Sequence, residues 1–147
     1  MSRLHHTGIT VTDLVRSVAF YRDLLGFGVV MEQEKRGGYL AAVTGYPGAH
    51  VRMAQLELEP GGPRIELFQY LDRPGRGGVG EHGDLGGFHL SLAVENLADL
   101  HRRLVAAGVE FISTPVEIES GVNRGGSCVY GLDPDGVRFE LFEEPRR

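Results

Sequence analysis

The chain has 147 residues, of which 41% are hydrophobic, and its formal net charge is −5 at pH 7. This size and composition fit one globular domain, or two small modules that share a core, and the sequence has no apolar run of about 18 residues that could span a membrane. The acidic balance argues against a general affinity for nucleic-acid phosphates, which requires a basic surface. A single cysteine, Cys128, rules out an internal disulfide, so we expect a cytoplasmic protein with neither a nucleic-acid nor a membrane partner.

The first half predicts a strand, a helix and further strands. Residues 4–11 alternate between larger apolar and small or polar types, which is typical of a strand. A helix follows, and its apolar stripe consists of Leu14, Val18, Tyr21 and Leu25. Thr12 or Asp13 can cap this helix, and Gly26 can end it. Strands are then expected at 27–34, 39–44, 50–58 and 64–70, one more than the three that follow the helix in a βαβββ module, which is the order we assign to this half.

Residues 72–87, DRPGRGGVGEHGDLGG, predict a flexible connector because glycine is so frequent there. Gly75, Gly77 and Gly80 satisfy a G-x-G-x-x-G string, but no helix opens after them, as a nucleotide-binding loop requires. We therefore interpret the segment as a linker between modules 1–71 and 88–147, with His82 as an ordinary side chain within it.

The second half repeats the pattern. A strand at 89–94 precedes a helix that Asn96 can cap, with Asp99 as the acidic partner of a capping box and Gly108 as the stop. Strands are expected at 109–112, 116–119, 126–132 and 137–142, with a turn at 133–136. Although four strands follow the helix here, this half is again taken as βαβββ.

Superposing the halves pairs His6 with His89 and Glu66 with Glu140. Each glutamate could equally face solvent on a half-exposed strand, and a register shift of one residue would put His5 in place of His6. Two imidazoles and two carboxylates form a mixed ligand set that suits one divalent metal per site, namely Ni, Co, Zn, Fe or Mn. Because the set has no thiolate, a catalytic site with open positions is favoured over a closed structural zinc site.

Three stretches resemble the vicinal oxygen chelate superfamily, which includes glyoxalase I, bleomycin resistance proteins, extradiol dioxygenases and methylmalonyl-CoA epimerase. They are HHTGITVTDLVRSVAFYRDLLGF, FHLSLAVENLADLHRRLVAAGVEF and VYGLDPDGVRFELFE. The resemblance covers essentially the whole chain. It implies an α+β fold of two tandem βαβββ modules forming a cup-like, half-open barrel, commonly in a homodimer. It also implies that His6, Glu66, His89 and Glu140 are the metal ligands.

Within that family, a carboxylate at position 66 indicates an isomerase, epimerase or lyase that abstracts a proton next to a metal-chelated carbonyl of a small-molecule substrate. Glu140 or Glu66 would then be the base. The resemblance fits both a glyoxalase I-like and an epimerase-like enzyme, although Thr10 stands where glutathione-dependent glyoxalases have Arg. Two alternatives stay open: an Fe(II) extradiol-type dioxygenase, and a metal-free drug-binding or resistance protein.

The substrate pocket has weaker candidates. Arg124 and Asn123 offer a cation and an amide on a glycine-rich loop, where a solvated side chain is the commoner case. On the expected first-half strands, the candidates are Tyr39, His50, Arg52 and Tyr70. Either one chain closes the site by itself, or two chains of a dimer contribute ligands to it.

Overall fold

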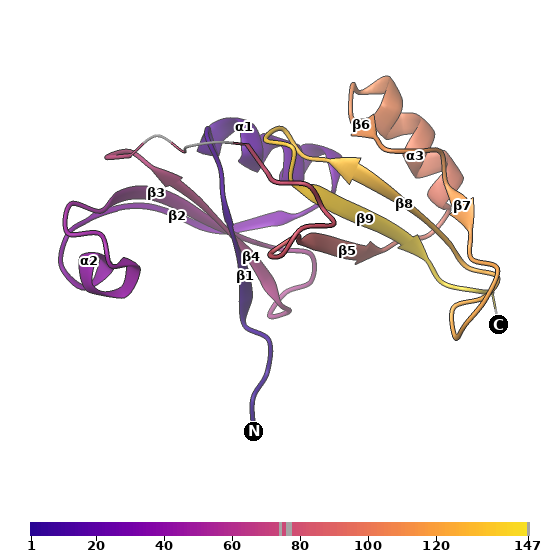
Figure 1. Cartoon of the computed structure of the whole chain (residues 1–147), viewed down its shortest axis with the longest axis horizontal. Helices are drawn as coiled ribbons and strands as arrows, with labels where there is room; N and C mark the ends of the chain where they lie inside the picture. Colours follow the sequence, from indigo (N-terminus) through magenta and orange to yellow (C-terminus); the bar gives the residue numbers. More distant parts are fainter. Residues whose placement is uncertain (74, 76–77, 147) are drawn as a thin grey trace. The chain divides into compact units, whose positions relative to one another are not determined.

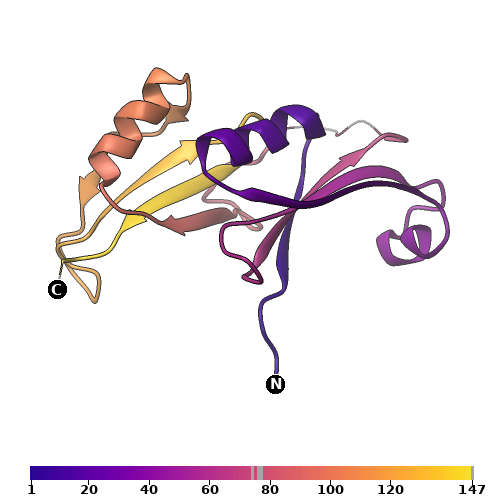
Figure 2. The ribbon, with the colours of Figure 1, turned by 180° about the vertical axis from the view of Figure 1, so that it is seen from behind.

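The computed structural model divides the chain into two compact units, Met1–Gly77 and Gly78–Arg147. It describes residues 1–73, 75 and 78–146. Each unit contains one β-sheet with helical segments against it (Figures 1 and 2), so the predicted α+β class is confirmed. The boundary between the units falls inside the predicted connector. None of the helices in the described ranges combines the length and the apolar character that crossing a bilayer requires.

Unit 1 has a four-stranded sheet in the order β1-β4-β3-β2, in which β1 and β4 run parallel and the other neighbours antiparallel. Its elements are β1 (His6–Thr10), α1 (Leu14–Ala19), the π-helical turn η1 (Phe20–Leu24), β2 (Gly28–Arg36), α2 (Tyr39–Thr44), β3 (His50–Glu57) and β4 (Arg64–Tyr70). Asp13 caps α1 as predicted, because its carboxylate accepts from the backbone N–H of Arg16 at 3.1 Å. Gly26, with φ +81°, ends the helical stretch.

The two faces of this sheet have different roles. Helix α1 lies over one face and buries the apolar stripe that its spacing predicts. The buried side chains on this side are Ile9, Leu14, Val18, Tyr21, Ala54, Leu56, Ile65 and Leu67. Burying one leucine or isoleucine stabilises a fold by about 1.5–3 kcal/mol, so this face forms the core. Glu66 lies between Ile65 and Leu67 in the sequence and therefore projects from the opposite face of the sheet, which we call the Glu66 face.

Residues 39–44 form helix α2, so the strand predicted there is wrong. Gly37 and Gly38 both have positive φ, +58° and +57°, and this backbone turns the chain away from the sheet. Strand β3 already pairs with β2 along its length, which leaves no ladder position for an additional strand. Instead, Leu40 packs onto buried Val51 and Ala49 at the end of the Glu66 face. Without the extra strand, unit 1 keeps the predicted order βαβββ.

Unit 2 repeats this architecture in the strand order β5-β9-β8-β6, with β7 also paired to β8. Its elements are β5 (His89–Ala93), α3 (Leu97–Ala106), β6 (Glu110–Phe111), β7 (Val116–Glu117), β8 (Ser127–Leu132) and β9 (Arg138–Glu143). The predicted turn at 133–136 is confirmed, because the Asp133 side chain accepts from the backbone N–H groups of Asp135 and Val137. The core of this unit lies between α3 and the sheet, and includes Leu92, Leu97, Leu104, Val129, Phe139 and Leu141.

The capping predicted for α3 is wrong in detail. Asn96 has a left-handed backbone, φ 53° and ψ 52°, and makes no side-chain capping bond. The cap comes from Glu143, whose carboxylate accepts from the backbone N–H groups of Asn96 at 3.0 Å and Leu97 at 3.3 Å. Asp99 accepts from Arg102 instead of completing a capping box. A carboxylate at a helix N-terminus also complements the helix dipole, so Glu143 ties α3 to β9.

Candidate functional site

Each unit brings one histidine and one glutamate together. The Nε2 atom of His6 lies 3.3 Å from Oε2 of Glu66, and Nε2 of His89 lies 3.5 Å from Oε2 of Glu140. The backbone register that produces these pairs is the same in both sheets: Gly8 stands opposite Glu66, and Ser91 stands opposite Glu140. In both sheets the histidine comes two residues before the residue that faces the glutamate. The two halves therefore carry the same pair of residue types at the same positions of their sheets.

The distances within the pairs would allow the two side chains of each pair to share a metal ion. Two ligand atoms that each lie about 2.1 Å from one ion are separated by about 3.0–3.4 Å at octahedral or tetrahedral angles. The Nε2–Oε2 distances of the two pairs, 3.3 and 3.5 Å, lie within or close to this range. Within either unit, the described residues do not gather three or more His, Cys, Asp or Glu side chains around a common point. Each unit thus offers one imidazole and one carboxylate.

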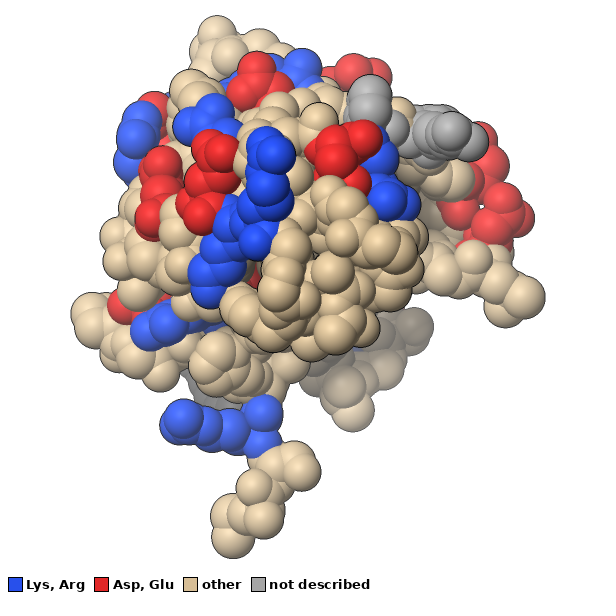
Figure 3. Space-filling view, turned by 90° about the vertical axis from the view of Figure 1, so that its left-hand side faces the viewer, with Lys and Arg blue, Asp and Glu red and all other residues tan. Residues whose placement is uncertain are grey.

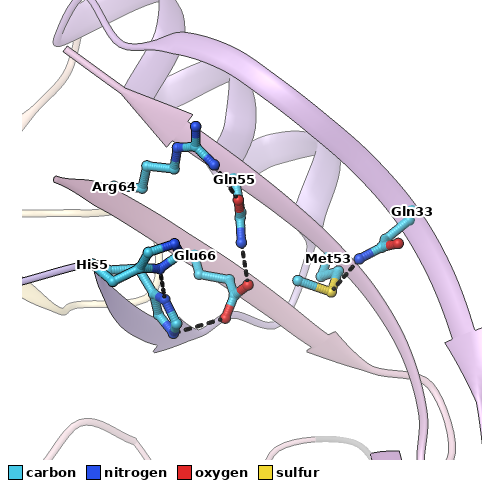
Figure 4. A network of polar contacts seen from close by, with 7 residues as sticks. His5, Gln33, Met53, Gln55, Arg64 and Glu66 are labelled. Carbon is cyan, nitrogen blue, oxygen red and sulfur yellow. Dashed lines mark hydrogen bonds and ion pairs between the residues drawn. The ribbon is translucent and has the colours of Figure 1, made fainter. Parts of the chain in front are cut away.

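Glu66 is held by a chain of polar contacts on the Glu66 face of the unit 1 sheet (Figure 4). The residue is only 7% exposed, and the Gln55 amide donates to its Oε1 atom at 2.7 Å. Arg64 in turn donates to Oε1 of Gln55 at 3.0 Å and to Glu57 at 3.1 Å. A buried carboxylate needs such compensation. Sequence reasoning missed Gln55, which becomes visible only when the β3–β4 register puts it directly opposite Glu66.

His5 does not replace His6 but supports it. The Nδ1 atoms of the two rings lie 2.7 Å apart, so that one of them donates to the other (Figure 4). His6 therefore has one ring nitrogen directed toward Glu66 and the other occupied by a second imidazole.

Glu140 has different neighbours. Tyr130 stands directly opposite it on β8, and Cys128 lies two residues earlier on the same face. Burial raises the pKa of the Cys128 thiol, and the negative charge of Glu140 and a hydrogen bond to it raise the pKa further. The pKa of Tyr130 is raised by burial and then by the same carboxylate. Cys128 is thus a protonated neighbour of Glu140, which disfavours a role as a nucleophile.

The predicted substrate residues lie apart from these pairs. Arg52 and His50 project from the α1 side of the sheet, opposite to Glu66, because each stands an odd number of positions from Gln55 on β3. Their placement therefore does not fit the predicted role. Tyr39 begins α2, is exposed, and accepts a hydrogen bond from Lys35.

The remaining candidates also have defined positions. Tyr70 does lie on the Glu66 face, stacked on Phe68. Asn123 and Arg124 are exposed in the loop that enters β8 at Ser127, the end opposite to His89 within the unit 2 sheet. On the surface that Figure 3 shows, Lys and Arg side chains are interspersed with Asp and Glu beside an uncharged area.

Comparison with known proteins decides the family. A model of the Glyoxalase/Bleomycin resistance protein/Dioxygenase superfamily matches residues 3–141. The chain belongs to this superfamily. Among curated relatives of this superfamily member, a lactoylglutathione lyase of Salmonella typhimurium is 33% identical over 96% of the chain and 92% of the relative. A 2-epi-5-epi-valiolone epimerase of an Actinomyces species is 30% identical over 97% of the chain and 79% of the relative.

Solved structures give the same fold for this superfamily member. A glyoxalase family protein from Bacillus cereus matches with a TM-score of 0.85 at 23% identity, covering 99% of the chain and 96% of that protein. Glyoxalase I from Leishmania major matches with a TM-score of 0.70 at 24% identity, covering 98% and 88%. At these identities the structures support the fold, whereas the named relatives support isomerase- or lyase-type chemistry.

Proposed function

We propose that the chain is a divalent-metal-dependent isomerase, epimerase or lyase that removes a proton next to a carbonyl group of a small substrate. The observation that carries the proposal is the pair of His–Glu contacts, 3.3 and 3.5 Å long, at equivalent positions of the two sheets. His6, Glu66, His89 and Glu140 would hold the metal, which is Ni, Co, Zn, Fe or Mn. When bound, such an ion polarises substrate oxygens as a Lewis acid and stabilises the negative charge that proton removal creates.

The two glutamates have unequal surroundings, which suggests unequal roles. Both carboxylate oxygens of Glu66 are engaged, one by Gln55 and the other by His6, and its side chain is 10% exposed. The side chain of Glu140 is 17% exposed and has the Tyr130 and Cys128 side chains beside it. A fixed and more buried carboxylate suits a permanent ligand, whereas a base needs access to the substrate carbon. We therefore assign proton transfer to Glu140 and metal binding alone to Glu66.

The relatives include a lyase and an epimerase, which are two of the reaction types in the proposal. A lactoylglutathione lyase and a valiolone epimerase match the chain at similar identity, and both names are compatible with proton transfer next to a carbonyl. Thr10 lies on the Glu66 face and is exposed, so a substrate carboxylate would find no cation at that position. An acyl or cyclitol ketone without such a carboxylate agrees better with this face than glutathione does. We also propose a homodimer, as the family resemblance implies, and a cytoplasmic location, as the composition predicts.

Solvent deuterium exchange tests the reaction class across several kinds of candidate substrate. The protein is loaded with Ni²⁺ or Co²⁺ and incubated in D₂O with a panel of α-hydroxyketones, cyclitol ketones and the glutathione hemithioacetal of methylglyoxal. We expect deuterium to appear at the carbon next to the carbonyl of at least one compound. Glu140→Gln should slow this exchange by about 10²–10⁴-fold, the usual contribution of a general base. Glu144→Gln, at an exposed position, is the matched control.

Other results would point to the alternatives. Oxygen uptake with catechols by the Fe²⁺-loaded protein, without deuterium exchange, would favour a dioxygenase. Failure of the wild-type protein to bind any of the five metals would leave a drug-binding or resistance protein. Unchanged exchange in Glu140→Gln would remove this residue from the proton transfer.

A further inference from the structure

We propose that His82, in the glycine-rich segment that precedes β5, is a positioning residue that fixes the ring of His89 for metal binding. The inference rests on the proposed function, because it concerns how one of the proposed ligands is held. It changes the interpretation of residues 81–87 from a passive linker to a part of the site that supports His89.

The contact between the two rings is specific. Nε2 of His82 lies 3.1 Å from Nδ1 of His89, and the ring centroids are 5.2 Å apart. Both rings also pack against Tyr130, the residue opposite Glu140, with centroid distances of 5.3 and 5.0 Å. The Nε2 atom of His89, at the far side of its ring, is directed toward Glu140. His89 thus has one nitrogen for the metal pair and the other against His82.

This arrangement determines which nitrogen must carry the proton. A neutral imidazole has one N–H and one lone pair, and a metal ligand needs the lone pair. If Nε2 of His89 binds the metal, Nδ1 carries the hydrogen and donates it to Nε2 of His82. Metal-binding histidines usually donate their second N–H to such a partner, which fixes the ring and raises its basicity. In unit 1, His5 stands in the corresponding relation to His6, at 2.7 Å.

The segment is built to hold His82 inward. Its apolar side chains are exposed, with Val79 at 52%, Leu85 at 106% and Phe88 at 44%, so it is not anchored by hydrophobic burial. Among the described residues from 71 to 88, His82 is the only one that is not exposed. A partly buried imidazole in a segment without buried apolar side chains is the informative feature here, because a polar ring is covered where no hydrophobic contact requires it. This indicates that the contact with His89 is what the segment maintains.

Two consecutive turns produce the inward position. The backbone N–H of Asp84 donates to the carbonyl of Glu81 at 3.0 Å, and that of Gly87 donates to the carbonyl of Asp84 at 2.9 Å. Gly87 is required here, since a Cβ atom on it would lie 2.1 Å from the carbonyl oxygen of His82. Gly83, in the same turns, has open space around the corresponding position. The two glycines therefore provide a matched pair for an experiment.

Cobalt titration tests the proposal. Co²⁺ affinity is measured by chelator competition, and the visible absorption spectrum reports the ligand set. We compare wild type with His82→Phe, which retains a ring against Tyr130 but cannot accept, and with His82→Gln, whose amide oxygen can accept. We expect about 10–100-fold weaker binding for His82→Phe with the same spectral bands, and substantial recovery in His82→Gln. Gly87→Ala should weaken binding as His82→Phe does, whereas Gly83→Ala, and His101→Ala in helix α3, should remain within about twofold of wild type.

Each contrary result has one meaning. Wild-type affinity in His82→Phe would overturn the positioning role. A loss in His82→Phe equal to that of His89→Ala, with altered absorption bands, would make His82 a ligand and also overturn it. Absence of binding of Co²⁺ and of the other four metals by the wild-type protein would refute the proposed function and this inference together, whereas wild-type Co²⁺ binding that is insensitive to His82 refutes the inference alone. Circular dichroism and the unfolding midpoint of the metal-free variants confirm that each is folded.

Discussion

Removing the Gln55 side chain tests whether the buried carboxylate of Glu66 depends on it. The amide donates at 2.7 Å to a carboxylate in a residue that is 7% exposed, so water cannot easily replace it. A hydrogen bond to a charged group contributes about 1.5–3 kcal/mol, and Gln55→Ala should destabilise the metal-free protein by about that amount. Urea unfolding followed by circular dichroism measures the change. Amide hydrogen exchange in β3 and β4 locates it in unit 1.

A matched variant separates this effect from the loss of a glutamine side chain. Gln33 lies on the same face, one strand further along, and its amide contacts only the sulfur of Met53 at 3.2 Å among the interactions drawn in Figure 4. Sulfur is a weak acceptor, so Gln33→Ala should cost about 1 kcal/mol less than Gln55→Ala. A double-mutant cycle of Gln55→Ala with Glu66→Ala should give a coupling energy above about 0.5 kcal/mol. Equal destabilisation by both glutamine variants, or a coupling energy near zero, would refute the reasoning.

Three further predictions concern stability. Glu143→Ala should destabilise unit 2 by about 0.5–2 kcal/mol and increase hydrogen exchange in the first turn of α3, because the helix loses its cap. Gly131→Ala should cost about 1–3 kcal/mol in urea unfolding, since its Cβ would lie 2.3 Å from the fully buried ring of Phe139. The backbone N–H of His50 lowers the pKa of Asp72, so the stability that Asp72 contributes is present above its unfolded pKa of about 3.9 and is lost as the pH falls through the lower folded pKa. Carboxyl NMR titration measures that folded pKa.

These predictions have controls at comparable positions. Glu144→Ala removes a carboxylate next to the cap and should leave α3 unchanged. Gly28→Ala adds a methyl group to another strand glycine with only an ordinary 3.7 Å contact. For Asp72, a folded pKa at or above about 3.9 would contradict the expected direction.

Local patterns predicted much of the fold because they reflect local physics. The stripe from Leu14 to Tyr21 and the cap at Asp13 depend only on neighbours within a turn or two. The same reasoning failed at 39–44, where a short apolar run is compatible with a strand or a helix. The decision there came from two glycines with positive φ and from an edge already occupied by β2. The cap of α3 also escaped prediction, because Glu143 is 47 residues from Asn96.

For the candidate site too, some residues could be predicted from the sequence and others depended on contacts between distant segments. The internal repeat paired His6 with His89 and Glu66 with Glu140, because equivalent residues of a repeat occupy equivalent positions, and the family resemblance then predicted them as ligands. The supporting residues could not be predicted in this way. Gln55 depends on strand register, and His82 depends on two turns in a segment whose composition predicts only flexibility. Alternation along β3 could have indicated that Arg52 faces away from Gln55, once Glu66 was chosen as the reference.

The differences between the two halves matter as much as the repeat itself. The residue that faces the glutamate is Gln55 in unit 1 and Tyr130 in unit 2, while the residue two positions earlier is Met53 or Cys128. A perfect repeat would give two equivalent carboxylates, and nothing would distinguish a ligand from a base. An amide that donates to Glu66, and a protonated thiol and a phenol beside Glu140, make the carboxylates chemically distinct. A repeat that keeps the His–Glu pair and varies its neighbours would thus allow the proposed division between a fixed ligand, Glu66, and a proton-transfer group, Glu140.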